Sequence, residues 1–108
     1  MAMTDNLEKM LASGRDDAML RFGLGSAYFN SGDFERVVHH LEQCIEQDET
    51  YSAAYKFLGK ALFKLGRKQE AHDVFARGLD VALAAGDKQT EREVRVFLKK
   101  SQRDDGDL

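Results

Sequence analysis

Apolar side chains recur every three or four residues along most of the chain, and short polar or glycine-containing turns interrupt this pattern. The spacing places the apolar residues on one face of an α-helix, whereas no stretch alternates in the way of a half-buried strand. The pattern predicts an all-α protein of about six helices. Gly86 and Asp87 supply a C-terminal glycine and an N-cap before the last of them. The predicted helices cover residues 4–13, 18–31, 34–47, 52–65, 68–85 and 88–102.

Two of these segments share residues at a fixed offset of 34 positions. The offset indicates an internal repeat whose copies stack, because a single helix pair cannot bury its apolar face alone. Gly25 and its counterpart Gly59 fall in mid-helix, where glycine costs about 1 kcal/mol relative to alanine. We therefore expect another helix to approach each glycine closely. The shared residues are Leu24, Gly25, Ala27, Phe29 and Gly32 in the first copy, and Leu58, Gly59, Ala61, Phe63 and Gly66 in the second.

The same offset reaches the first predicted helix, where Leu7 is in register with Leu41 and Phe75, and Met10 with Cys44 and Gly78. The first helix therefore has the pattern of the second half of a repeat. We predict that the last helix closes the other end of the stack, with Val94, Phe97 and Leu98 facing inward. The predicted organisation is a single domain over 1–103, with a half repeat at 4–13, repeats at 18–51 and 52–85, a closing helix at 87–102 and a loose acidic tail at 104–108.

With this spacing the chain resembles the tetratricopeptide repeat (TPR) family, whose 34-residue unit folds as two antiparallel helices. The second unit matches the family pattern at Tyr55, Leu58, Gly59, Leu62, Ala71 and Phe75, and the first unit matches it at Leu24, Gly25, Tyr28 and Leu41. Arg21 departs from the pattern, which has an aromatic residue there, and Val37 replaces a small alanine. The resemblance implies a right-handed superhelical stack of antiparallel helix pairs.

Composition and charge narrow the possible partners. The net charge of −3 conceals an asymmetry, because residues 1–50 carry 4 basic and 10 acidic side chains, whereas residues 51–108 carry 12 and 9. The overall negative balance argues against a nucleic-acid partner. No run reaches the roughly 18 apolar residues of a membrane span, and no secretion signal is recognisable. We therefore predict a cytoplasmic protein with no membrane association.

Three lysines of the second repeat lie on one helix face, because Lys56, Lys60 and Lys64 are spaced four residues apart. In the TPR family this face lines an inner groove that binds peptides. We interpret the chain as a protein–protein interaction adaptor that binds a peptide of acidic or carboxylate character. The alternative is that the lysines only solvate a helix face and the aromatic rings fill the core. The resemblance implies a groove formed by Phe22, Ser26, Phe29, Asn30, Lys56, Lys60, Phe63 and Lys64.

A second hypothesis is a structural module whose open ends are covered by a second copy, as in a homodimer, or by a larger complex. The opposite charges of the two halves motivate it. No catalytic motif is recognisable, so we predict neither an enzyme nor a cofactor.

The spacing of His40 and Cys44 suits two metal ligands on one helix, but two ligands do not make a site. We therefore predict no bound metal. We expect Cys44 to be a buried, inert thiol. The histidines, His39, His40 and His72, are expected on or near the outer surface.

Overall fold

The computed structural model describes residues 3–103, and this range forms six α-helices. They are α1 (Met3–Ala12), α2 (Ala18–Ser31), α3 (Phe34–Gln47), α4 (Ser52–Lys64), α5 (Lys68–Ala85) and α6 (Lys88–Arg103). Each end lies within one residue of the range predicted from the hydrophobic periodicity, so the all-α prediction is confirmed. The predicted acidic tail, 104–108, lies outside the described residues.

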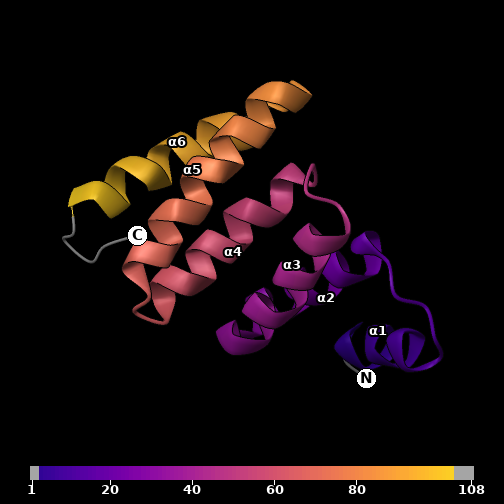
Figure 1. The fold of residues 1–108 in the computed structure, drawn as a ribbon. Coiled ribbons are helices and arrows are strands. Elements are labelled where there is room, and N and C mark those ends of the chain that lie inside the picture. Colours follow the sequence, from indigo (N-terminus) through magenta and orange to yellow (C-terminus); the bar gives the residue numbers. More distant parts are fainter. Residues whose placement is uncertain (1–2, 104–108) are drawn as a thin grey trace.

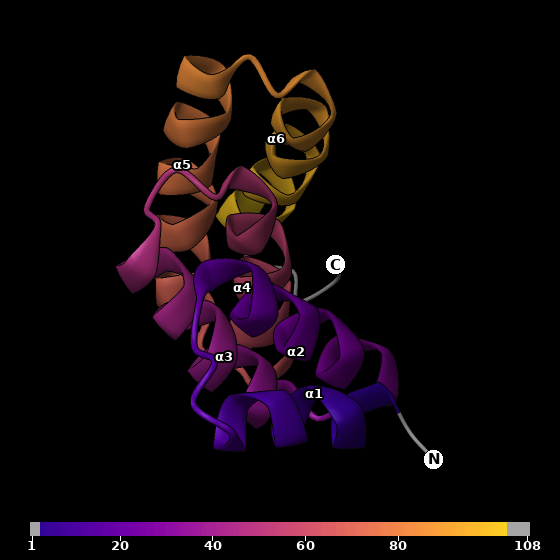
Figure 2. The same ribbon diagram turned by 90° about the vertical axis from the view of Figure 1, so that its right-hand side faces the viewer.

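Consecutive helices pack as antiparallel pairs, α2 with α3 and α4 with α5 (Figure 1). The first helix, α1, packs against α2 at one end of the stack, and α6 packs against α5 and α4 at the other end (Figure 2). Because α4 also contacts both α2 and α6, these three helices form one side of the stack. The molecule measures 42 × 28 × 19 Å, as expected for repeats added along a line.

Left-handed glycines end the helices where the sequence predicted turns. Gly32, Gly66 and Gly86 have φ angles of 80°, 81° and 70°, a region that residues with a Cβ atom rarely adopt. The Asp87 carboxylate accepts a hydrogen bond from the backbone N–H of Thr90 at 3.1 Å, as its predicted role of N-cap requires. These local signals explain why the helix ends could be predicted.

Mid-helix glycines let the two helices of each pair touch. A Cβ atom added to Gly25 would lie 2.3 Å from Cδ2 of Leu41, and one added to Gly59 would lie 2.4 Å from Cε1 of Phe75. Leu41 and Phe75 are fully buried. The predicted close approach is therefore confirmed in both units, and the equivalent residues make it.

The second helix of each unit carries a small residue at an equivalent position, Gly78 in the second unit and Cys44 in the first. A Cβ atom added to Gly78 would lie 2.6 Å from Cβ of Tyr55. Cys44 is fully buried, and burial raises the pKa of its thiol to about 11. The prediction of a buried thiol is confirmed, and a thiol with a raised pKa stays protonated at neutral pH.

Arg21 occupies the position that Tyr55 has in the second unit, and it organises a polar network in which Arg21 and His40 are buried and Asp16 is partly exposed. Its guanidinium donates to both carboxylate oxygens of Asp16, each at 2.8 Å, and to Nδ1 of His40 at 3.0 Å. The side chain of Gln47 donates to Asp16 as well, at 2.8 Å. These hydrogen bonds satisfy an arginine that is only 8% exposed.

The same network reaches α1 through Glu8. The hydroxyl of Tyr28 donates to the Glu8 carboxylate at 2.5 Å, and this hydrogen bond raises the pKa of Tyr28 to about 12. Nε2 of His40 lies 3.7 Å from the same carboxylate, and the His40 ring stacks on Tyr28 with 5.6 Å between centroids. The network thus joins α1 to the first complete helix pair. The expectation of a surface histidine is wrong for His40, which is buried because Arg21 and Tyr28 hold its ring inside.

Acid is expected to destabilise this network at His40. Burial lowers the pKa of His40, an effect that nearby Arg21 reinforces and that Glu8 opposes, and only the unprotonated Nδ1 can accept the Arg21 hydrogen bond. The unfolded chain then binds the proton more readily than the native state does. The free energy of unfolding should therefore fall as the pH drops below about 6.5 toward the lowered native pKa.

Urea denaturation at neutral and at mildly acidic pH measures this dependence. A His40→Gln variant should show a flatter pH dependence than His39→Gln, which replaces the exposed neighbouring histidine. Equal pH dependence in the two variants would contradict the assignment to His40.

Candidate functional site

Side chains of α2, α4 and α6 meet on one surface, which we call the three-helix face. The central helix α4 contributes two lysines and a phenylalanine, α2 contributes two phenylalanines, and α6 contributes a glutamate and a phenylalanine. The sequence predicted that α2 and α4 would share this surface, but it treated α6 only as a closing helix. The face comprises Phe22, Phe29, Lys56, Phe57, Lys60, Glu93 and Phe97.

A row of half-buried aromatic rings crosses the face from α2 to α4. The ring of Phe57 lies 5.9 Å from that of Phe22 and 5.3 Å from that of Phe29, measured between centroids. Tyr51 extends the row with its ring 4.9 Å from Phe22, and Phe34 does so with its ring 5.4 Å from Phe29. The row offers apolar surface to a ligand and holds the two helices together. Sequence reasoning missed Phe57, because consecutive residues of a helix do not share a face and its place became visible only through its contacts with Phe22 and Phe29.

The three lysines of α4 have different surroundings. Nζ of Lys56 lies 2.8 Å from Oε1 of Glu93, so this ammonium is already paired. Nζ of Lys60 lies 5.1 Å from the centroid of Phe29 and 4.9 Å from that of Phe97, a position between two rings. No carboxylate of residues 3–103 lies within ion-pair distance of it, and burial lowers the pKa of Lys60. A carboxylate brought by a ligand would therefore find an unpaired, partly desolvated cation.

The other predicted groove residues fall into three environments. Lys64 is exposed one turn beyond Lys60, and Asn30 is exposed at the end of α2. Ser26 is half-buried. Phe63 is only 6% exposed and belongs to the hydrophobic core, because its helix α4 has neighbours on both sides. The structure therefore brings Phe22, Phe29, Lys56 and Lys60 together but gives Phe63 a packing role.

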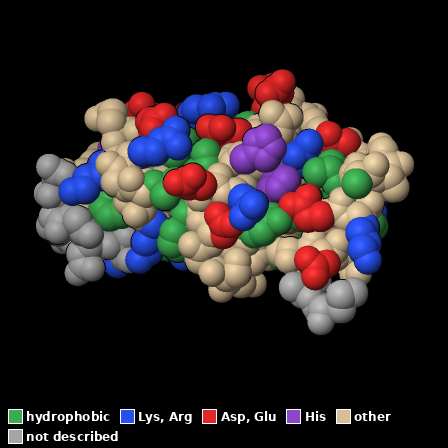
Figure 3. All heavy atoms as spheres, turned by 90° about the horizontal axis from the view of Figure 1, so that it is seen from below, with side chains coloured by type: hydrophobic (Ala, Val, Ile, Leu, Met, Phe, Trp, Pro, Cys, Tyr) green, Lys and Arg blue, Asp and Glu red, His purple; other side chains and the backbone are tan. Residues whose placement is uncertain are grey.

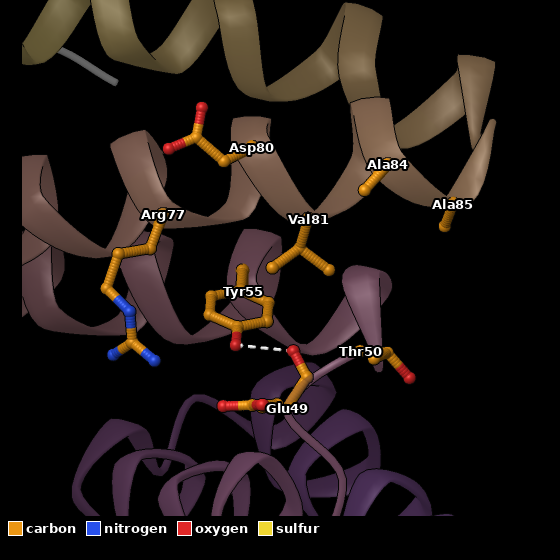
Figure 4. Close-up of a pocket in the computed structure, with 8 residues that line it drawn as sticks. All are labelled: Glu49, Thr50, Tyr55, Arg77, Asp80, Val81, Ala84 and Ala85. Carbon is orange, nitrogen blue, oxygen red and sulfur yellow. Dashed lines mark hydrogen bonds between the residues drawn. The ribbon is translucent and has the colours of Figure 1, made fainter.

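A separate hollow of about 460 Å³ lies between the α3–α4 connection and the outer side of α5 (Figure 4). The hydroxyl of Tyr55 donates to the backbone carbonyl of Glu49 at 2.7 Å, and the Arg77 guanidinium lies 5.5 Å from the Tyr55 ring. In the first unit, Asp16 and Gln47 hydrogen-bond to each other at the equivalent positions, where this hollow has Thr50 and Val81. Its lining offers small apolar groups, the Arg77 guanidinium and the side chains of Glu49 and Asp80. The lining residues are Glu49, Thr50, Tyr55, Arg77, Asp80, Val81, Ala84 and Ala85.

Figure 3 shows histidine side chains (purple) among acidic and basic side chains on the face that it draws. His39 lies beside His40 with 5.0 Å between ring centroids, and Nδ1 of His72 lies 3.2 Å from the Ser101 hydroxyl on α6. Within the described range, no group of three or more His, Cys, Asp or Glu side chains is arranged to hold a metal ion. None of the helices in the same range has the length and apolarity that a bilayer crossing requires.

Comparison with known proteins gives concordant matches. The family model ANAPC3, described as anaphase-promoting complex, cyclosome, subunit 3, matches residues 5–78. The TPR repeat-containing protein PA0015 of Pseudomonas aeruginosa is 50% identical over 101 residues, which cover 94% of this chain and 96% of that protein.

Solved structures agree with these matches. The solution structure of protein BPP2914 from Bordetella parapertussis superimposes with a TM-score of 0.83 at 40% identity, covering 97% of this chain and 91% of the other. The crystal structure of a tetratricopeptide repeat domain protein from Salinibacter ruber gives a TM-score of 0.78 at 26% identity, with 83% and 100% of the two chains covered. The six helices are therefore packed as antiparallel pairs in a TPR-like fold.

Proposed function

Because the chain belongs to the tetratricopeptide repeat family, we propose that it is an adaptor that binds an acidic peptide segment of another protein on its three-helix face. Repeats of this family generally serve as protein–protein interaction modules. The acidic character of the ligand is our own inference from the side chains of the face. The arrangement of groups supports binding, since cations and aromatic rings line the face and its carboxylate, Glu93, is paired with Lys56.

The environment of Lys60 is the observation that carries this proposal. Its ammonium has aromatic rings on two sides, at 5.1 and 4.9 Å, and no carboxylate within ion-pair distance among the described residues. A partly buried cation without a counter-ion is unfavourable, and a ligand carboxylate would relieve this cost. Phe22, Phe29 and Phe57 would contact apolar side chains of the same segment.

Reversing the charge at Lys60 should weaken the binding of a fluorescein-labelled acidic peptide by about tenfold or more, because a repulsive charge replaces an attractive one. Fluorescence anisotropy measures the affinity at low and moderate salt, and the salt dependence should also be smaller for Lys60→Glu. Lys99→Glu is the matched control, because Lys99 is exposed beside Arg95 and Val96 on another surface of α6. Equal weakening by both variants would exclude a specific role for the face.

A second candidate is a structural module that self-associates. The observation that favours it is exposed apolar surface on two separate helices, since Met19 of α2 is 66% exposed and Val96 of α6 is 51% exposed. A second copy could cover such surfaces. Light scattering over a range of concentrations distinguishes the candidates, because a monomer that binds peptides fits the adaptor and a stable dimer fits the module.

A further inference from the structure

The lysines of α4 on the three-helix face differ in whether a carboxylate pairs with them. Lys56 and Glu93 form an ion pair of 2.8 Å, and only 15% of the Lys56 side chain is exposed. The pair therefore contributes no net charge. Lys60 lies one helical turn further and Lys64 two turns further, and neither has a carboxylate partner among residues 3–103. The free positive charge of the face thus begins at Lys60.

Three aromatic rings lie at the end that carries the neutral pair, whereas Phe29 and Phe97 flank Lys60 at the other end. The Lys56 ammonium lies 4.6 Å from the centroid of Phe57, which is next to Phe22, and Tyr51 packs on the far side of Phe22. All three rings are half-buried and so keep part of their surface available. This end of the face therefore combines apolar rings with an ion pair of no net charge, whereas the end with Lys60 and Lys64 carries two cations.

We infer that the face selects a bipartite segment, with apolar side chains against Phe22 and Phe57 and carboxylates at Lys60 and Lys64. This inference rests on the proposed function and names the class of its ligand. Lys56 and Lys64 lie about 12 Å apart along α4. An extended peptide covers that length in about four residues, so the apolar and acidic parts belong close together in the partner's sequence.

Glu93 determines the preference for a segment that is apolar at the Lys56 end. Its carboxylate, on α6, pairs with the Lys56 ammonium. It would repel a ligand carboxylate placed at the Lys56 end of the face. A segment with acids along its whole length would therefore place one of them against Glu93. A segment that is apolar at this end meets no such repulsion. Glu93 thus acts as a specificity-determining residue supplied by the closing helix.

Two labelled peptides of equal length test this inference. One carries two leucines at one end and two aspartates at the other, and the second carries two aspartates at both ends. The wild-type protein should bind the leucine-containing peptide several-fold more tightly. Glu93→Gln frees Lys56 and should improve binding of the doubly acidic peptide by about threefold or more, so that the preference is lost or reversed.

Glu91→Gln is the matched control, because it removes the same charge from α6 at a residue paired with Arg95 outside the face. It should leave the preference unchanged. Equal effects of Glu91→Gln and Glu93→Gln, or no preference in the wild-type protein, would overturn the inference while binding through Lys60 survives. If neither peptide binds, or if Lys60→Glu has no effect on either, the proposed function itself fails.

Discussion

Replacing Gly59 by alanine should destabilise the protein by about 2–3 kcal/mol, although alanine is favoured over glycine in a helix by about 1 kcal/mol. The added Cβ atom would lie 2.4 Å from Cε1 of Phe75. That ring is fully buried and stacks on Phe97 at 5.6 Å between centroids, so it has little room to move. The helices would have to separate. Urea denaturation followed by circular dichroism measures the change in the free energy of unfolding.

Gly23→Ala is the control for this prediction, because Gly23 is also a mid-helix glycine. A Cβ atom added there would lie 3.7 Å from Cδ1 of Leu7, which is an ordinary van der Waals contact. This variant should be neutral or more stable by up to about 1 kcal/mol. A loss of stability at Gly23 equal to that at Gly59 would show that backbone flexibility, not helix contact, explains the glycines.

Replacing Arg21 by alanine should cost about 2–3 kcal/mol of stability, because it leaves the buried His40 without its donor. The variant also removes the guanidinium that binds both carboxylate oxygens of Asp16. Much of the effect should come from the lost desolvated hydrogen bonds rather than from the exposed part of the ion pair. Thermal and urea unfolding both report this loss.

The control for Arg21 is Arg36→Ala, since Arg36 pairs with Asp33 on the exposed surface of α3. Surface pairs of this kind contribute little to stability, so we expect almost no change. If Arg21→Ala changed the free energy of unfolding as little as Arg36→Ala, the Arg21 network would not be what holds α1 against the first repeat. A large loss at Arg21 alone would support that role.

The fold was predictable because its signals are local. Helix periodicity, the left-handed glycines and the 34-residue register each depend on a short stretch of sequence, and the observed helices confirm them. The need for glycine at positions 25 and 59 was also predictable. Glycine lowers helix stability, so its presence in mid-helix indicates that another helix approaches closely. The buried state of Cys44 followed from its register with Gly78.

The parts that escaped prediction depend on contacts between helices far apart in the chain. Arg21 departs from the family pattern, and its compensation by Asp16 and His40 becomes visible only when α2 and α3 are side by side. Glu93 is 37 residues from Lys56, so its pairing could not be read from spacing on one helix. Phe63 is equivalent to Phe29 in the register, but its position in the central helix buries it. The 34-residue register therefore predicts which residues are equivalent in the two helix pairs, but it does not predict that equivalent residues are equally exposed.

Chemical-shift mapping of the backbone amides during titration with the leucine- and aspartate-containing peptide tests the central proposal most directly. We expect shifts concentrated in α2, α4 and α6, around Phe29, Lys60 and Phe97, and we expect these shifts to be lost in Lys60→Glu. Shifts confined to the outer helices α3 and α5, or unchanged by Lys60→Glu, would contradict it.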